Sequence, residues 1–374
     1  MKIITNPHFG QSHAKIMDIM DYWDPEEIYR FHQGIGNKET PLIKLPELAK
    51  TLGIANILVK DESCRLGLSS FKPLGASYAI YKEIQRNSQI RTFCTATDGN
   101  HGRSVAWMAR KLKKRAVVYV PSGTASERIK HIKQEGAEVE IVEGGYDDTV
   151  RKAMTRCEDE NLISENEKWA LIQDTAWNGY ERIPLNIMKG YWTQIHEITK
   201  QLKNDKIDIL ILQLGVGSWA ASIIGYIIKY WKNIPLIISI EPFSANCLYE
   251  SIKLGERVSI NKDESTIMAG LNCGTVSLIA WDILKKYINQ AISISDRYAE
   301  EAMRILARPF LSDQPIIAGE SGASGLGGLL ALFDIKAKEQ SNEASFLDRS
   351  KTVLIINTEG NTDPISYNNI ITAS

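Results

Sequence analysis

One lysine of this chain stands among small and apolar neighbours, in the stretch Ser69-Ser70-Phe71-Lys72-Pro73-Leu74-Gly75. A partly buried amine has a lowered pKa, and its neutral form can form and exchange imines with a carbonyl compound. Most lysines are solvated surface residues. The chemical interpretation of Lys72 therefore depends on what accompanies it elsewhere in the chain.

A second candidate segment, Asp98-Gly99-Asn100-His101-Gly102, follows one predicted strand and begins a predicted helix. Backbone N–H groups of a glycine-flanked loop can bind a carboxylate, such as that of an amino acid. The Asn100 side chain offers a donor and an acceptor to a ring hydroxyl. The structural alternative is that Asp98 and Asn100 only cap the helix. No second histidine stands at metal-ligand spacing from His101, so we predict no metal site.

A third segment, Gly215-Val216-Gly217-Ser218, separates a buried strand from an amphipathic helix. Backbone N–H groups there can surround a phosphate at the positive end of the helix. Two alternatives stay open. One is a tight turn without a ligand. The other is the dinucleotide site of an NAD-dependent oxidoreductase, because Gly215-x-Gly217-x-x-Ala220 fits that fingerprint and Glu241 ends the next strand about 20 residues on.

Six short apolar runs predict the strands that position these segments: 91–96, 116–120, 138–142, 207–212, 236–240 and 353–356. Runs that are apolar on both faces and alternate with helical patterns are typical of parallel strands covered on each side. Helices are predicted from Arg103 to Lys113 and from Trp219 to Trp231. The fold class is therefore α/β, with doubly wound parallel sheets.

Length and charge narrow the function classes. The 374 residues are enough for two lobes, and the 44 basic and 45 acidic residues leave a formal net charge of −1. Such a balance gives no reason to expect nucleic acid as a partner. Five scattered cysteines argue against a disulfide framework. Because no apolar run resembles a signal peptide or a membrane span, we expect a cytoplasmic protein without a membrane partner.

The three segments, in this order, resemble the fold-type II pyridoxal-phosphate enzymes, the group of threonine dehydratase and tryptophan synthase β. A narrower resemblance, to the diaminopropionate ammonia-lyases, covers the chain from about Thr40 to Tyr367. It rests on these further blocks: Lys60-Asp61-Glu62-Ser63, Ala96-Thr97-Asp98, Tyr146-Asp147-Asp148, Gln173-Asp174-Thr175-Ala176-Trp177, Met268-Ala269-Gly270-Leu271, Gly319-Glu320-Ser321-Gly322-Ala323 and Thr358-Glu359-Gly360.

This resemblance implies a cofactor, a two-lobed architecture and a homodimer. Residues 1–74 and 191–374 would form a large cofactor-binding domain, and residues 75–190 a small mobile domain. Pyridoxal 5'-phosphate would be bound to Lys72 as a Schiff base. The other implied cofactor-binding residues are Phe71, Asn100, Gly215, Val216, Gly217, Ser218 and Thr358. The implied substrate-binding residues are Thr97, Asp98, Gly99, His101 and Asp174.

The implied reaction is elimination of ammonia from D- or L-2,3-diaminopropionate, which gives pyruvate and two ammonia. Lys72 would take the α-proton of the L-isomer and Asp98 that of the D-isomer, while Asp174 would be the electrostatic partner of the β-amine. The leaving amine needs an acid, and either the Lys72 ammonium or a protonated Asp98 fits. Elimination or replacement on another β-substituted amino acid, such as serine or threonine, stays open.

Departures from the family pattern concern the surroundings of the site. Asn178 and the pair Thr275-Val276 differ from the usual residues, and we expect them to touch the pocket walls. Glu320 either lines the pocket or caps a helix. None of these departures removes a proposed catalytic group.

Overall fold

Two separate β-sheets organise the chain. The computed structural model describes residues 1–374 except 12, 165, 204, 261–264, 338–341 and 374. The larger sheet has the strand order β1-β10-β9-β8-β11-β3-β2 and the smaller one β6-β5-β4-β7. The strands are β1 (Lys2–Thr5), β2 (Leu42–Lys44), β3 (Asn56–Asp61), β4 (Ile90–Ala96), β5 (Arg115–Pro121), β6 (Glu138–Val142), β7 (Lys168–Leu171), β8 (Ile209–Gln213), β9 (Leu236–Pro242), β10 (Gln290–Ile294) and β11 (Thr352–Asn357).

Both sheets are parallel in their interiors. All three pairings of the smaller sheet are parallel. In the larger sheet, only the edge strands β1 and β2 run antiparallel to their neighbours. The predicted α/β class with parallel sheets is confirmed.

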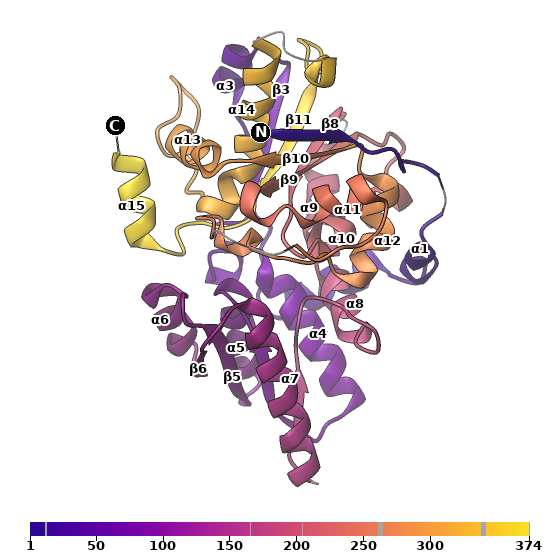
Figure 1. The fold of residues 1–374 in the computed structure, drawn as a ribbon, viewed down its shortest axis with the longest axis vertical. Helices are drawn as coiled ribbons and strands as arrows, with labels where there is room; N and C mark the ends of the chain where they lie inside the picture. The colour runs from indigo at the N-terminus through magenta and orange to yellow at the C-terminus, as the bar shows by residue number, and fades with distance from the viewer. Residues whose placement is uncertain (12, 165, 204, 261–264, 338–341, 374) are drawn as a thin grey trace.

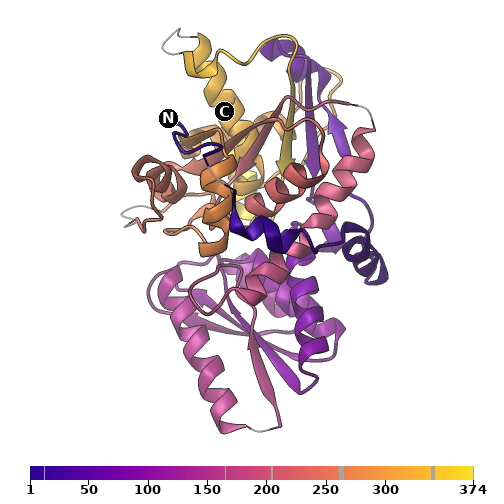
Figure 2. The ribbon, with the colours of Figure 1, turned by 90° about the vertical axis from the view of Figure 1, so that its right-hand side faces the viewer.

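Helices cover both sheets, and the two lobes are stacked along the long axis of the molecule (Figures 1 and 2). The helices are α1 (Lys15–Met20), α2 (Pro25–Gly34), α3 (Pro46–Leu52), α4 (Lys72–Arg86), α5 (Asn100–Lys111), α6 (Ser126–Gln134), α7 (Tyr146–Ile163), α8 (Arg182–Gly190), α9 (Trp192–Leu202), α10 (Ser218–Tyr230), α11 (Cys247–Leu254), α12 (Leu278–Tyr287), α13 (Asp296–Ala307), α14 (Glu320–Ala337) and α15 (Pro364–Thr372). The smaller sheet lies within residues 90–171. The predicted domain boundaries and mobility stay predictions.

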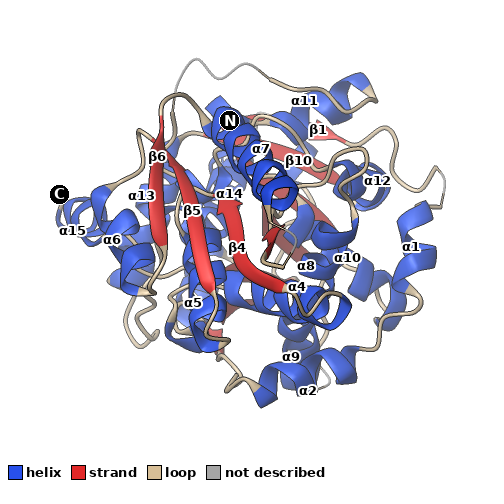
Figure 3. Ribbon diagram, turned by 90° about the horizontal axis from the view of Figure 1, so that it is seen from below, coloured by secondary structure: helices blue, strands red, loops and turns tan. Residues whose placement is uncertain are grey.

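Alternation along the strands of the smaller sheet places helices on both of its faces. Cys94 of β4 and Val117 of β5 pack in one apolar cluster with Cys157 of α7. Phe93 belongs instead to the cluster that contains Val105 of α5. Since successive strand residues point to opposite faces, α7 and α5 cover opposite faces of this sheet, as the view from below shows (Figure 3).

The same alternation divides the core of the larger lobe. Leu210 and Leu212 of β8 pack in the cluster that contains the α10 residues. Ile209 and Ile211 pack in the cluster that contains α14. The predicted helix from Trp219 to Trp231 is largely confirmed, but it starts at Ser218 and ends at Tyr230. Likewise, the helix predicted from Arg103 to Lys113 is α5, which spans Asn100–Lys111.

Candidate active site

The carboxyl ends of β4, β7, β8 and β11 meet the start of α4 at one cleft. Ligands of parallel α/β sheets bind at this end of the strands. Every residue predicted for catalysis, cofactor or substrate lines this cleft: Phe71, Lys72, Thr97, Asp98, Gly99, Asn100, His101, Asp174, Gly215, Val216, Gly217, Ser218 and Thr358. The structure thus brings together all the predicted site residues, and their individual roles remain proposals.

Lys72 is the first residue of α4, and its side chain is 21% exposed. Its Nζ donates to Asp174 Oδ2 at 2.6 Å. Burial alone lowers the pKa of the ammonium, but the Asp174 carboxylate outweighs burial and raises that pKa above its ordinary value. The sequence argument took the pKa of this amine to be lowered. That expectation is wrong here, because it omitted the carboxylate that pairs with the amine.

Two close contacts fix the start of α4. His32 is fully buried and its Nε2 donates to the backbone oxygen of Leu74 at 2.9 Å. Helix α8 approaches the same turn so closely that a Cβ on Gly190 would lie 2.3 Å from that oxygen. The backbone that carries Lys72 is therefore held from two sides.

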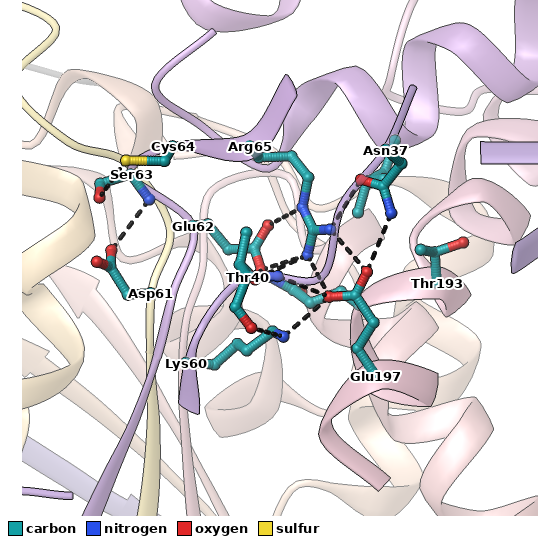
Figure 4. A network of polar contacts seen from close by, with 12 residues as sticks. Asn37, Thr40, Lys60, Asp61, Glu62, Ser63, Cys64, Arg65, Thr193 and Glu197 are labelled. Atoms are coloured by element: carbon teal, nitrogen blue, oxygen red, sulfur yellow. Dashed lines mark hydrogen bonds and ion pairs between the residues drawn. The ribbon is translucent and has the colours of Figure 1, made fainter. Parts of the chain in front are cut away.

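A buried network of charges surrounds Arg65, which precedes Lys72 by seven residues in the chain (Figure 4). Arg65, which begins a short 3₁₀ turn (Arg65–Gly67), donates to Glu62 at 2.7 Å and to Glu197 of α9 at 2.7 Å. Lys60 Nζ donates to Glu197 at 2.9 Å. The four side chains are completely buried. Two cations and two anions balance one another, which is the condition for burying charge in an apolar interior.

The loop before α5 is built around Thr97. Its Oγ1 accepts from the backbone N–H groups of Gly99 at 3.0 Å and Gly102 at 3.2 Å. Gly99 has φ +152°, a conformation that residues with a Cβ rarely adopt. Asn100 donates through Nδ2 to the Glu359 carboxylate, which orients its amide at the cleft. The alternative in which Asn100 only caps the helix is disfavoured, since α5 has no side-chain cap.

Asp174 and His101 lie side by side in the cleft. His101 Nε2 stands 2.7 Å from the backbone oxygen of Ile172, so this nitrogen carries the hydrogen. Burial lowers the pKa of His101, which is therefore neutral and has a lone pair on Nδ1. That Nδ1 is 3.9 Å from Asp174 Oδ2 and has no hydrogen-bond partner among the described residues. Burial raises the pKa of Asp174, but Lys72 outweighs it and lowers this pKa to about 2.

The glycine loop between β8 and α10 is suited to a phosphate. Gly217 has φ +87°, and a Cβ there would lie 2.6 Å from Leu284. The first N–H groups of α10 have no partner within the helix and carry its positive dipole end. Ser218 Oγ donates to the backbone oxygen of Asp174 at 2.7 Å, which joins this loop to the segment after β7. These features, with Lys72 and Thr358 in the same cleft, fit pyridoxal phosphate.

Several cleft residues were not predicted. They are Ala96, Arg128, Tyr146, Tyr191, Gln213, Leu214, Trp219, Ala220, Gly270, Leu271, Cys273, Ser321 and Glu359. For six of them the only signal was a place in the motif blocks quoted above: Ala96, Tyr146, Gly270, Leu271, Ser321 and Glu359. Tyr146 accepts from Gln173 Nε2 at 2.6 Å, so its own hydroxyl hydrogen is directed elsewhere. Gln213 and Arg128 gave no signal in the sequence.

The sequence expectations about the pocket walls have mixed outcomes. Asn178 does not line the cleft but a different hollow, beside α4, α7 and β7. Thr275 and Val276 are not among the residues that line the cleft, although the Val276 side chain lies next to Gly217, which does line it. Glu320 does not line it either. It begins α14 and accepts from Ser366 at 2.5 Å. The helix-terminal alternative for Glu320 is the one that the structure supports.

Glu241, the acidic residue that the NAD alternative requires, is engaged elsewhere in the structure. Glu241 is completely buried, and its two carboxylate oxygens accept from the backbone N–H groups of Leu248 and Tyr249 at the start of α11. Burial raises the pKa of this carboxyl to about 8. A group used in this way does not reach a ribose in the cleft.

Among the residues that the structure describes, no group of three or more His, Cys, Asp and Glu side chains is placed to hold a metal ion. In the same part of the chain, no helix is long and apolar enough to cross a membrane.

The fold and the cleft together define a class of protein. The family model "Pyridoxal-phosphate dependent enzyme" matches residues 35–359. The solved structure of diaminopropionate ammonia lyase from Escherichia coli, in complex with an aminoacrylate–pyridoxal phosphate azomethine intermediate, superposes with a TM-score of 0.90 and 37% identity, over 99% of this chain and 96% of that one.

Sequence comparison narrows the class. Diaminopropionate ammonia-lyase of Escherichia coli strain K12 is 39% identical over 98% of this chain and 93% of its own length. The enzyme of Salmonella typhimurium is 41% identical over 92% of this chain and 91% of its own. The chain belongs to the diaminopropionate ammonia-lyase family of pyridoxal-phosphate dependent enzymes.

Proposed function

We propose that this protein is a carbon–nitrogen lyase that eliminates ammonia from 2,3-diaminopropionate and yields pyruvate and two ammonia. The observation that carries the proposal is the pair of carboxylates, Asp98 and Asp174, in the same cleft as Lys72. Diaminopropionate has one more amino group than serine or threonine. A cleft with these two carboxylates can balance the additional positive charge.

The residues that would hold the cofactor surround the cleft. Lys72 would supply the amine to which it is bound, Asn100 would meet the ring hydroxyl, and the Gly215–Ser218 loop at the start of α10 would bind the phosphate. Phe71 would contact the ring, and the hydroxyl of Thr358 would be the partner of the ring nitrogen. When bound, pyridoxal phosphate supplies an electron sink that makes the α-proton of an amino acid acidic.

Lys72 and Asp98 are the proposed bases of the two isomers. Lys72, released as a neutral amine when the substrate amine replaces it on the cofactor, would take the α-proton of the L-isomer. The carboxylate of Asp98 would take that of the D-isomer. Gly99 and Thr97 would border the site of the substrate carboxylate, and the Thr97 hydroxyl would hold their loop in place by accepting from Gly99 and Gly102. The donors would be the first N–H groups of α5, which have no partner within the helix. The acid that protonates the leaving amine is proposed to be one of the same two groups.

Asp174 and His101 are the proposed binding groups of the β-amine. Asp174 is ionised at neutral pH, since its pKa is about 2. His101 presents a neutral nitrogen with a lone pair beside it. An ammonium group can donate to both, whereas a hydroxyl has one hydrogen and carries no charge. Diaminopropionate should therefore be preferred over serine.

The direct test is a product balance with purified protein. Pyruvate and ammonia are measured from D- and L-diaminopropionate, serine, threonine and chloroalanine. Diaminopropionate should give two ammonia per pyruvate. Serine and chloroalanine would give one ammonia per pyruvate, and threonine would give one ammonia per 2-oxobutanoate. A marked preference for serine or threonine would contradict the proposed substrate and favour the alternative, β-elimination or β-replacement on another β-substituted amino acid.

Two matched asparagine variants test the division of roles. Asp98→Asn should reduce turnover of the D-isomer more than that of the L-isomer. Asp174→Asn should reduce turnover of both isomers, but should affect chloroalanine less, because chloride leaves without an ammonium group. Equal losses on D- and L-diaminopropionate in Asp98→Asn would remove the stereospecific role of Asp98.

Assembly and location are part of the same proposal. We expect a homodimer in the cytoplasm, with the small domain of residues 75–190 closing over the substrate. Light scattering of the purified protein measures the first expectation. A monomeric mass at working concentration would contradict it.

A further inference from the structure

The carboxyl ends of β8 and β11 place two side chains against each other at the floor of the cleft. Gln213 is the last residue of β8, and Thr358 directly follows β11, its parallel neighbour. Both side chains line the cleft, although each residue is almost completely buried. Gln213 Nε2 donates to Thr358 Oγ1 at 3.0 Å.

The surroundings of Gln213 fix the orientation of its amide. Its Nε2 also lies 2.8 Å from the backbone oxygen of Ile356, 3.2 Å from that of Ser321 and 3.3 Å from that of Gly322. All of these neighbours are acceptors. Rotating the amide by half a turn would direct Oε1 at three carbonyl oxygens, which is electrostatically unfavourable. The nitrogen therefore faces Thr358, and the Thr358 oxygen accepts.

This arrangement sets the direction of the Thr358 hydroxyl. One lone pair of its oxygen is used by Gln213. Among the described residues, no acceptor takes a hydrogen bond from this hydroxyl, so its hydrogen is left to point into the cleft that Thr358 lines. Thr358 can donate to a group in front of it that has a lone pair, and it is poorly placed to accept from a group that carries a hydrogen.

We propose that Gln213 is a positioning residue that fixes Thr358 as a donor and so keeps the ring nitrogen of the bound cofactor unprotonated. The proposal rests on the proposed function, since it takes Thr358 as the partner of that nitrogen. Gln213 acts through Thr358 and needs no contact with the reacting atoms. A neutral ring nitrogen makes the ring a weaker electron sink, which suits prompt loss of the β-amine.

The test measures the ring nitrogen itself. Cofactor-free protein is reconstituted with ¹⁵N-labelled pyridoxal phosphate, and the ¹⁵N chemical shift is followed against pH. In wild type, the shift should be that of an unprotonated nitrogen at neutral pH. In Gln213→Met, which keeps the length of the side chain but has no donor, the pKa of the ring nitrogen should rise by about one unit, the worth of one neutral hydrogen bond.

A double-mutant cycle separates this role from a merely structural one. Thr358→Val should itself change the ¹⁵N titration, and Gln213→Met should add nothing in that background. An unchanged titration in Gln213→Met, or an equal change with and without Thr358, overturns the proposal. So does a protonated nitrogen in the wild type at neutral pH, a measurement that needs no variant.

The product balance keeps the two proposals distinguishable. If pyruvate and two ammonia form from diaminopropionate while the ¹⁵N titration of Gln213→Met is the same as that of the wild type, only the positioning role fails. If the titration responds as expected but another amino acid is the substrate, only the proposed substrate fails.

Discussion

Glu197→Gln should destabilise the large lobe strongly, because the buried network of Arg65, Lys60, Glu62 and Glu197 contains equal numbers of cations and anions (Figure 4). The Glu197 carboxylate accepts from Arg65 at 2.7 and 2.8 Å and from Lys60 at 2.9 Å. Burial raises the pKa of Glu197, but Arg65 outweighs it and lowers this pKa to about 2, so the group is charged at neutral pH.

The neutral amide would leave one buried cation without a counter-charge. Breaking a buried pair in this way costs about 3–5 kcal/mol. Urea unfolding of the cofactor-free protein, followed by circular dichroism and by tryptophan fluorescence, measures the loss. The double variant Glu197→Gln, Lys60→Met removes one charge of each sign and should cost less than Glu197→Gln alone. A loss below about 1 kcal/mol, or a double variant as costly as the sum of the singles, would refute the argument from charge balance.

Three further predictions concern the support of the cleft. Burial lowers the pKa of His32 to about 3, below the value near 6.5 of an unfolded histidine. The free energy of unfolding of the wild type should therefore fall as the pH drops from about 6.5 toward 3. In urea unfolding experiments, His32→Gln should reduce that slope by up to about 1.4 kcal/mol per pH unit. Gly190→Ala places a Cβ 2.3 Å from the backbone oxygen of Leu74 and should lower the free energy of unfolding by roughly 3 kcal/mol or more. A free energy of unfolding within about 1 kcal/mol of the wild-type value would contradict this. Glu359→Gln should weaken pyridoxal-phosphate binding about ten-fold in a fluorescence titration, because the charged acceptor that orients Asn100 is lost; unchanged affinity would show that Asn100 needs no such orientation.

The strands that the sequence predicted are those in which β-branched and apolar residues recur at short spacing. The run 138–142 coincides with β6, and the runs 91–96 and 236–240 lie within β4 and β9. Other strands were missed, among them two with buried polar side chains. β3 contains Lys60, and β10 contains Gln290 and Ser293, all of them buried. The burial of Lys60 depends on Glu197, a partner far away in the sequence, which no local pattern reveals.

The positions of the site residues were predictable, whereas their hydrogen bonds were not. The motifs around Lys72, Asn100 and Gly217 sufficed to place these residues in one cleft. The raised pKa of Lys72 follows mainly from Asp174, which a different strand end brings to it. In the same way, the proposed direction of the Thr358 hydroxyl hydrogen follows from Gln213 on a neighbouring strand. Such pairings depend on how distant segments meet in space, and composition and spacing do not encode them.

The most direct test of the central proposal is to locate the cofactor on the chain. Purified protein, reconstituted with pyridoxal phosphate, is reduced with borohydride, digested and examined by mass spectrometry, with Lys72→Ala treated in parallel. The proposal predicts a yellow protein that loses its colour on reduction and carries a pyridoxyl group on Lys72, with no such label in the variant. A label on another lysine, or a colourless protein that binds NAD instead, would contradict it.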